Sequence, residues 1–113
     1  MLSAPGGRNL FIGHLAGGIP ADPSATNNTF VGPSAGSSNE TGSGNTYIGT
    51  YAGSSSKNGV QNVYIGYSAG GTFTDGGGIA NVFVGTGAGQ RTNLGGSNGA
   101  VNAPALPAQA KSP

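Results

Sequence analysis

One repeated motif restricts the fold of this chain more than any other feature. The pattern N-x-[FY]-[IV]-G-x-x-A-G occurs five times, as NLFIGHLAG, NTFVGPSAG, NTYIGTYAG, NVYIGYSAG and NVFVGTGAG. Successive copies begin 19, 17, 17 and 19 residues apart. Self-similarity at a short and nearly constant period is typical of a solenoid, in which each coil packs on the previous one.

Each copy begins with a short predicted strand, because aromatic and β-branched residues lie between Asn and Gly. Successive side chains of a strand point to opposite faces, so the aromatic and the aliphatic position face different ways. Both positions are apolar in every copy, which favours a parallel sheet that is covered on both sides. The sequence therefore predicts an all-β fold, a short parallel β-solenoid (a β-roll or an interwound β-prism) of five rungs of 17–19 residues.

The two apolar positions predict two ladders. The aliphatic position never carries a polar group, so we expect it to form the core ladder, whose members are Ile12, Val31, Ile48, Ile65 and Val84. The aromatic position accepts Tyr as readily as Phe, which indicates that a hydroxyl there reaches water or a partner chain. We therefore expect an inter-chain aromatic ladder formed by Phe11, Phe30, Tyr47, Tyr64 and Phe83.

The polar part of the motif predicts a third ladder and a tight turn. Asn is the residue most able to bond its own backbone in a turn, and stacked Asn side chains can form an amide ladder. Its predicted members are Asn9, Asn28, Asn45, Asn62 and Asn81. The segment G-x-x-A-G reads as a turn in which Gly permits positive φ and Ala keeps the backbones close.

Composition indicates that the chain associates with copies of itself. The 113 residues include 24 Gly and no Trp or Cys. Ordering each backbone residue costs roughly 1–2 kcal/mol, and about twenty large apolar side chains at about 1.5–3 kcal/mol each do not offset that cost. We therefore expect a homo-oligomer rather than a monomer.

Charge excludes several classes of partner. The chain has four Lys and Arg against three Asp and Glu, a net charge of +1. No basic patch is available for nucleic acid, and no polybasic stretch for anionic lipid. No segment approaches membrane-spanning length, so we expect no membrane insertion. The N-terminal sequence MLSAPGGRNLF has no charged region followed by an apolar one, so we expect no secretory signal.

The sequence offers no constellation of catalytic or metal-binding residues. His14 is the one His, and a single His near Asp22 makes neither a triad nor a metal site. The acids Asp22, Glu40 and Asp75 fall in different connecting segments, which argues against paired carboxylates and against calcium-binding repeats. GTGAG is the fifth repeat rather than a nucleotide loop. We expect no enzyme, no cofactor and no metal.

The repeat divides the chain into three parts. We expect an N-terminal extension over 1–8, the five-rung repeat domain over 9–93 and a Pro/Ala-rich extended arm over 94–113. Composition alone leaves open whether the arm is a linker or an anchor. In the anchor interpretation, one or both termini bind neighbouring structural proteins of a particle.

The repeat N-T-x-[IV]-G-x-x-A-G, with connectors such as SSNETGSGN, resembles the head-type repeats of bacteriophage tail-fibre proteins and trimeric autotransporter adhesins. The resemblance implies a homotrimeric spike or fibre on a virion surface or in an extracellular fibre, with a host-surface glycan as its partner. The alternatives are a self-assembling filament or capsid-cementing subunit, or the head fragment of a bacterial trimeric adhesin. An ice-binding solenoid ranks lower, because Thr46 and Thr50 lack counterparts in most copies.

Overall fold

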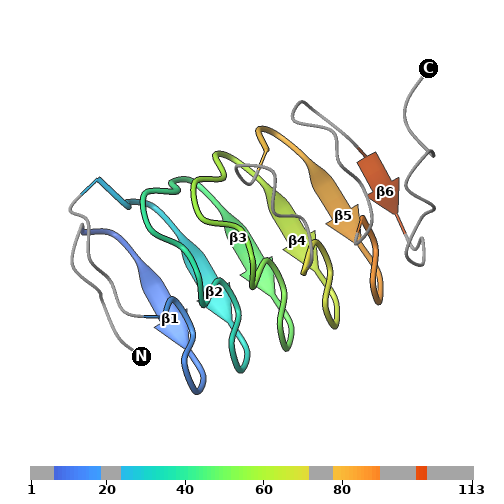
Figure 1. The fold of residues 1–113 in the computed structure, drawn as a ribbon, viewed down its shortest axis with the longest axis horizontal. Coiled ribbons are helices and arrows are strands. Elements are labelled where there is room, and N and C mark those ends of the chain that lie inside the picture. The colour runs from blue at the N-terminus through green and yellow to red at the C-terminus, as the bar shows by residue number, and fades with distance from the viewer. Residues whose placement is uncertain (1–6, 19–23, 72–77, 90–98, 102–113) are drawn as a thin grey trace.

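A computed structural model describes residues 7–18, 24–71 and 78–89, together with the backbone of 99–101 (Figure 1). The described part contains six strands of three residues each. They are β1 (Leu10–Ile12), β2 (Thr29–Val31), β3 (Thr46–Ile48), β4 (Val63–Ile65), β5 (Val82–Val84) and β6 (Gly99–Val101). All of them pair in parallel, in the order β1-β2-β3-β4-β5-β6.

The register of the sheet follows the repeat. Phe11 pairs with Phe30, Phe30 with Tyr47 and Tyr47 with Tyr64, so equivalent motif positions lie side by side. After β2 and after β3, the chain passes through a turn and a connector before the next strand begins beside the previous one (Figure 1). Isolated parallel bridges join the connectors as well, from Ser43 to Val60 and from Val60 to Ile79. The predicted all-β parallel solenoid is therefore confirmed.

The sheet extends further than the repeat pattern indicates. β6 lies within 94–113, the predicted Pro/Ala-rich arm, and Ala100 pairs with Phe83. By sequence spacing, Asn98, Val101 and Ala105 occupy the Asn, aliphatic and Ala positions of a sixth copy. Ala stands at the aromatic position and Asn replaces the first Gly, which hides this copy from a search for the full motif. The stack of strands thus continues beyond residue 93.

At two positions in each coil the backbone is left-handed although most of the residues there are not Gly. One is the second variable residue of the turn, where Leu15, Ser34, Tyr51 and Ser68 have φ of 58–62°. The other immediately precedes the ladder Asn, where Arg8, Asn27, Gln61 and Ala80 have φ of 57–61° and Gly44 has 70°. Left-handed backbone costs a non-Gly residue about 1–2 kcal/mol. The stacked coils supply the hydrogen bonds that hold these residues in place.

Candidate functional site

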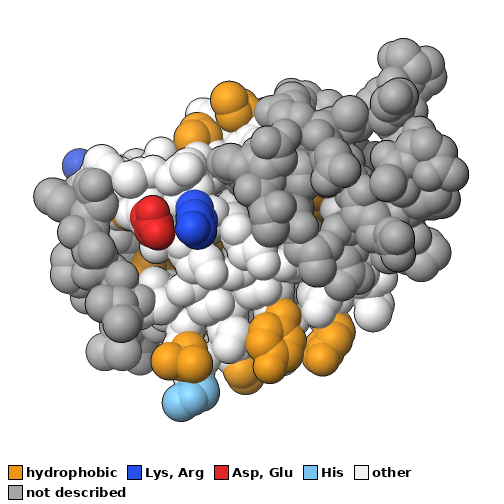
Figure 2. Space-filling model, viewed as in Figure 1, with side chains coloured by type: hydrophobic (Ala, Val, Ile, Leu, Met, Phe, Trp, Pro, Cys, Tyr) orange, Lys and Arg blue, Asp and Glu red, His pale blue; other side chains and the backbone are white. Residues whose placement is uncertain are grey.

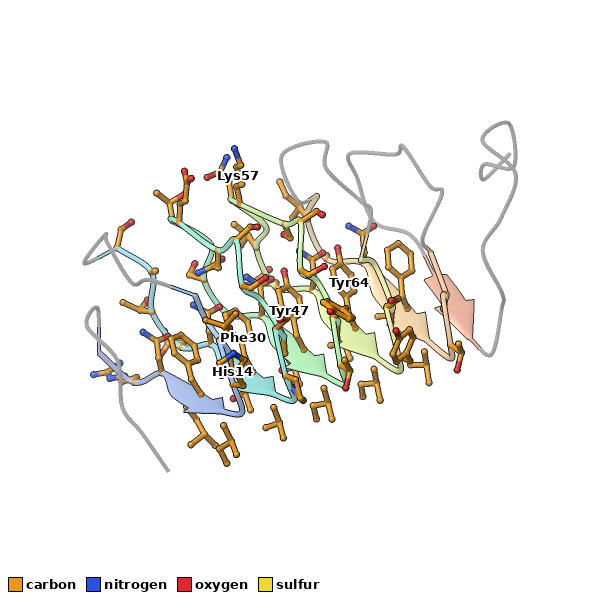
Figure 3. All side chains as sticks on the ribbon, turned by 60° about the horizontal axis from the view of Figure 1, so that its bottom comes forward. His14, Phe30, Tyr47, Lys57 and Tyr64 are labelled. Carbon is orange, nitrogen blue, oxygen red and sulfur yellow. The ribbon has the colours of Figure 1, made fainter. Side chains whose placement is uncertain are left out.

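The interior of the solenoid is filled by one column of aromatic rings. Phe30, Tyr47, Tyr64 and Phe83 are fully buried, and Phe11 at the end of the column is 8% exposed. Neighbouring rings stack with centroids 4.7–4.9 Å apart and interplanar angles of 4–15°. This spacing equals the distance between adjacent strands, about 4.7–4.9 Å. Figure 3 shows the labelled side chains of Phe30, Tyr47 and Tyr64 following one another from left to right along the stack of coils.

The structure reverses the predicted assignment of the two strand faces. The predicted inter-chain ladder (Phe11, Phe30, Tyr47, Tyr64 and Phe83) forms the core within one chain. The predicted core ladder (Ile12, Val31, Ile48, Ile65 and Val84) faces outward, with Ile12 44% and Ile48 37% exposed. The physical reason is size, because flat rings stacked at the strand spacing fill the interior and leave the aliphatic side chains outside.

The two Gly residues of the motif make room for different neighbours. A Cβ at Gly49 would lie 2.6 Å from the carbonyl oxygen of Gly66 in the next coil. A Cβ at Gly53 would lie 2.5 Å from the ring of Tyr47 in the same coil. Real Cβ atoms do not approach other atoms so closely, so the first Gly permits coil-to-coil contact and the second permits the ring. This second Gly, always six residues after the ring, is the sequence signal that the ring is internal.

The predicted Asn ladder is present and buried. Asn45 Oδ1 accepts hydrogen bonds from the backbone N–H and from Nδ2 of Asn62, at 3.0 and 3.1 Å. Asn45 Nδ2 donates to the carbonyl of Gly59, 2.7 Å away at the end of the same coil, and to Asn28 Oδ1 at 3.2 Å. The same backbone bond to the preceding ladder oxygen recurs at Asn28, Asn45 and Asn81. The first four ladder residues therefore each close their own coil and fix the next one, rather than capping a turn locally.

The buried Tyr hydroxyls find partners inside the chain. Tyr47 donates to Ser56 Oγ at 3.1 Å, and Ser56 is itself fully buried. Burial raises the pKa of Tyr47 to about 12, although hydrogen bonds with Ser56 and Asn62 oppose the shift. Burial also raises the pKa of Tyr64, and the neighbouring Tyr47 adds to the effect. The expectation that these hydroxyls reach water or another chain is wrong for Tyr47, because Ser56 supplies its partner.

Alkaline pH is expected to destabilise the fold through these two Tyr residues. The folded state binds the phenolic protons more tightly than the unfolded state, whose Tyr pKa is about 10. Their contribution is complete below about pH 10 and falls as the pH rises towards about 12, by up to about 1.4 kcal/mol per pH unit for each Tyr. Melting temperatures measured between about pH 8 and pH 12 test this.

The variant Tyr47→Phe/Tyr64→Phe should lose less stability over that range, whereas Tyr51→Phe at an exposed position serves as the matched control. Equal alkaline losses in the double variant and the wild type would contradict the assignment.

The outer face of the sheet is aliphatic and free of charge. We use the name "outer face" for two columns of side chains, namely Leu10, Thr29, Thr46, Val63 and Val82, and Ile12, Val31, Ile48, Ile65 and Val84. Eight of these ten are aliphatic and the other two are Thr. The turns beside it expose Leu15 (57%), Tyr51 (46%) and Tyr67 (55%). Figure 2 shows hydrophobic side chains gathered along the lower edge of the molecule.

Ionisable side chains are sparse and scattered in the described ranges. His14, Glu40 and Lys57 are all exposed. A surface depression lined by Leu15, Gly18, Ser37, Ser38, Asn39, Glu40 and Lys57 brings together one acid and one amine. In the part of the chain that the structure describes, no group of three or more His, Cys, Asp or Glu could hold a metal ion. Asp22 and Asp75 lie outside the described residues.

No helix in the described part of the chain has the length and apolar character needed to cross a membrane. Comparison of the chain with protein-family models, with curated proteins and with solved structures finds no match. The described geometry, a closed aromatic core with an aliphatic outer face, therefore carries the functional argument.

Proposed function

We propose that the chain is a non-enzymatic structural protein that assembles with copies of itself, as a homotrimer, into a short rigid spike or fibre segment. The observation that carries the proposal is the combination of a core closed within one chain and an uncharged aliphatic outer face. The fold is elongated, with principal-axis extents of 38 × 21 × 16 Å. The exposed face gives this fold a surface to pack on other chains, because contiguous exposed apolar surface marks interaction sites.

Rigidity supports a mechanical role. Backbone hydrogen bonds of 2.8–2.9 Å join turn to turn, from Gly17 N–H to Ala35 O, Gly36 to Ala52, Gly53 to Ala69 and Gly70 to Ala88. The strand pairs, the buried Asn ladder and the ring stack in the interior connect successive coils as well. Such a rod resists bending and gives proteases few open backbone segments.

The location of the rod is a proposal that rests on the resemblance of the repeat to fibre proteins. We place it on the surface of a virion or in an extracellular fibre. Polar residues of the connectors, among them Thr41, Asn58 and Gln61, are exposed and uncharged. Hydroxyl and amide groups of this kind suit a neutral host-surface glycan, which they would bind by hydrogen bonds.

Native mass spectrometry of the wild-type chain under dilution tests the structural proposal. A sharp trimer that persists on dilution is the expected result. An open-ended series of oligomers would instead favour the filament or capsid-cementing alternative, in which the ends of the sheet carry the contacts. A stable folded monomer would contradict self-assembly.

A further inference from the structure

Asn58 and Gly59 form an Asn-Gly pair on the connector between β3 and β4. Asn58 is exposed, and its neighbour Lys57 lies on the side of the coils away from the strands (Figure 3). Gly59 carries no side chain, so its backbone nitrogen can closely approach the Asn58 amide. We infer that Asn58 is a site of spontaneous modification, at which the amide is lost through a cyclic succinimide. This inference does not depend on self-assembly.

The backbone N–H of Gly59 is available as the nucleophile. Within the described part of the chain this N–H donates no hydrogen bond. The carbonyl of Gly59, by contrast, accepts two, from Ser43 N–H at 3.1 Å and from Asn45 Nδ2 at 2.7 Å. Attack through an N–H that is already bonded would first break its hydrogen bond, which is unfavourable. Ring closure through the nitrogen of Gly59 breaks none.

The other described Asn residues lack this arrangement. The ladder residues Asn28, Asn45 and Asn62 are fully buried, and the residue after each of them donates its N–H to a ladder carbonyl at 2.8 Å. Asn27 is exposed, but the N–H of the residue after it is bonded to Asn9 Oδ1 at 2.9 Å. Among the described Asn residues, exposure and an unbonded following N–H therefore coincide at Asn58.

Thr41, in the preceding coil, activates the Asn58 amide. Its hydroxyl donates a hydrogen bond to Asn58 Oδ1 at 2.7 Å. Attack of the nitrogen on Cγ places negative charge on Oδ1, and a donor that is already aimed at this oxygen stabilises the charge as it forms. The hydrogen bond from Thr41 therefore favours attack on Asn58.

The reaction needs no reagent besides water. The nitrogen of Gly59 bonds to Asn58 Cγ and gives up its proton, the Cγ–Nδ2 bond breaks, and Nδ2 leaves with that proton as ammonia. Water reaches the exposed ring and opens it at one of its two carbonyl carbons. Opening at Cγ leaves aspartate at position 58, whereas opening at the backbone carbonyl carbon leaves isoaspartate. Each product has a carboxylate in place of the amide, so the net charge of +1 falls to zero.

The isoaspartate product affects the Asn ladder. It lengthens the main chain by one carbon immediately before Gly59, whose carbonyl accepts the hydrogen bond from Asn45 Nδ2 that closes the coil. Displacing this carbonyl weakens the closure. Aspartate keeps the length of the main chain, and its carboxylate can still accept the hydrogen bond from Thr41. We therefore expect isoaspartate to destabilise the coil more than aspartate does.

Peptide mass spectrometry of the folded chain, stored in mildly alkaline buffer, tests the inference. Fragmentation that distinguishes the two products should show both of them at Asn58, with intact amides at Asn45 and Asn62. Cleavage after Arg91 places Asn98, which begins a second Asn-Gly pair, on a different peptide. The synthetic peptide SSSKNGVQNV, residues 54–63, gives the reference rate. An intact Asn58 in the chain after the peptide has been converted would overturn the inference, as would equal conversion at Asn45.

Variants test the role of Thr41 and the effect on stability. Thr41→Val should slow conversion about 2–10-fold, the range for one hydrogen bond, whereas Thr41→Ser should retain the wild-type rate. An unchanged or faster rate in Thr41→Val would overturn the assignment of Thr41. Asn58→Gln closes a larger ring much more slowly, so it should keep its mass and melting temperature on storage. The stored wild type should melt at a lower temperature than the fresh protein, and equal losses in both proteins would contradict the proposed effect on the ladder.

Discussion

Replacing Gly49 with Ala is expected to lower the free energy of unfolding by about 3 kcal/mol or more, because steric overlap adds to backbone strain. Gly49 has φ of 132°, and an added Cβ would lie 2.6 Å from the carbonyl oxygen of Gly66. That oxygen belongs to the backbone of the adjacent coil, so it cannot turn away as a side chain could. Separating the coils would stretch the hydrogen bond from Gly66 N–H to Ile48 O, which is 2.8 Å long.

Gly44→Ala is the matched control. Gly44 also has positive φ, 70°, but its added Cβ would meet nothing closer than Gln61 Cγ at 3.4 Å. Ala80 already occupies the equivalent position two coils later with φ of 57°. We expect this variant to lose only about 1 kcal/mol, the cost of left-handed backbone. Urea denaturation followed by circular dichroism measures the free energy of unfolding of both variants. Similar losses for Gly49→Ala and Gly44→Ala would contradict the steric explanation.

Replacing Asn45 with Ala is expected to cost about 3 kcal/mol, because a buried N–H left without a partner costs about 1–3 kcal/mol and each further lost hydrogen bond about 0.5–1.5 kcal/mol. The substitution leaves the Asn62 backbone N–H without its partner. It also removes one of the two hydrogen bonds that the Gly59 carbonyl accepts, the other coming from the Ser43 N–H at 3.1 Å. Both Gly59 and Asn62 are buried, so water does not replace the lost bonds. The coil then loses its closure and its fixed contact with the next coil at one point.

Asn58→Ala in the same coil is the control, because Asn58 is exposed and its Oδ1 accepts one bond, from Thr41 Oγ1 at 2.7 Å. Exposed substitutions of this kind usually change stability by less than about 0.5 kcal/mol. A third variant, Asn45→Asp, keeps the size but turns an acceptor towards the Gly59 carbonyl. It should be less stable at neutral pH than at acid pH, where the protonated carboxyl can donate. Equal losses for Asn45→Ala and Asn58→Ala would rule out a structural ladder.

The sequence predicts the repeat unit, its strand, its parallel stacking and the Asn ladder, because each depends on local pattern and period. One of the two apolar columns fills the interior, and the choice depends on which side chains have the volume to fill the space inside a coil. A pattern that is apolar at both positions does not show this. Tyr47 illustrates the difficulty, since its hydroxyl suggests exposure until Ser56, nine residues later, is found to accept its hydrogen bond. The Gly six residues after each ring indicates which column is internal, because a side chain at that position would overlap the ring.

β6 shows a different limit. Its segment keeps Asn98, Val101 and Ala105 at motif spacing but has Ala100 in place of a ring. A pattern that requires an aromatic residue stops at Phe83, and the Pro and Ala content then suggests an extended arm. Backbone pairing needs no ring, so β6 still joins β5. Backbone pairing between strands can therefore continue beyond the last copy of the side-chain pattern that predicts it.

Each ring stacks only on the rings directly before and after it. The number of coils can therefore change without a change in the packing within each coil. Interactions in such a stack extend to nearest neighbours alone, so its free energy grows by nearly the same increment with every coil. Duplicating residues 45–61 would insert one more ring, one more ladder Asn and one more pair of outer-face side chains, a Thr and an Ile. The rod would lengthen by about 4.7–4.9 Å with its cross-section unchanged. Gene duplication can thus set the length of such a stack in uniform steps, with no change to the core or the outer face.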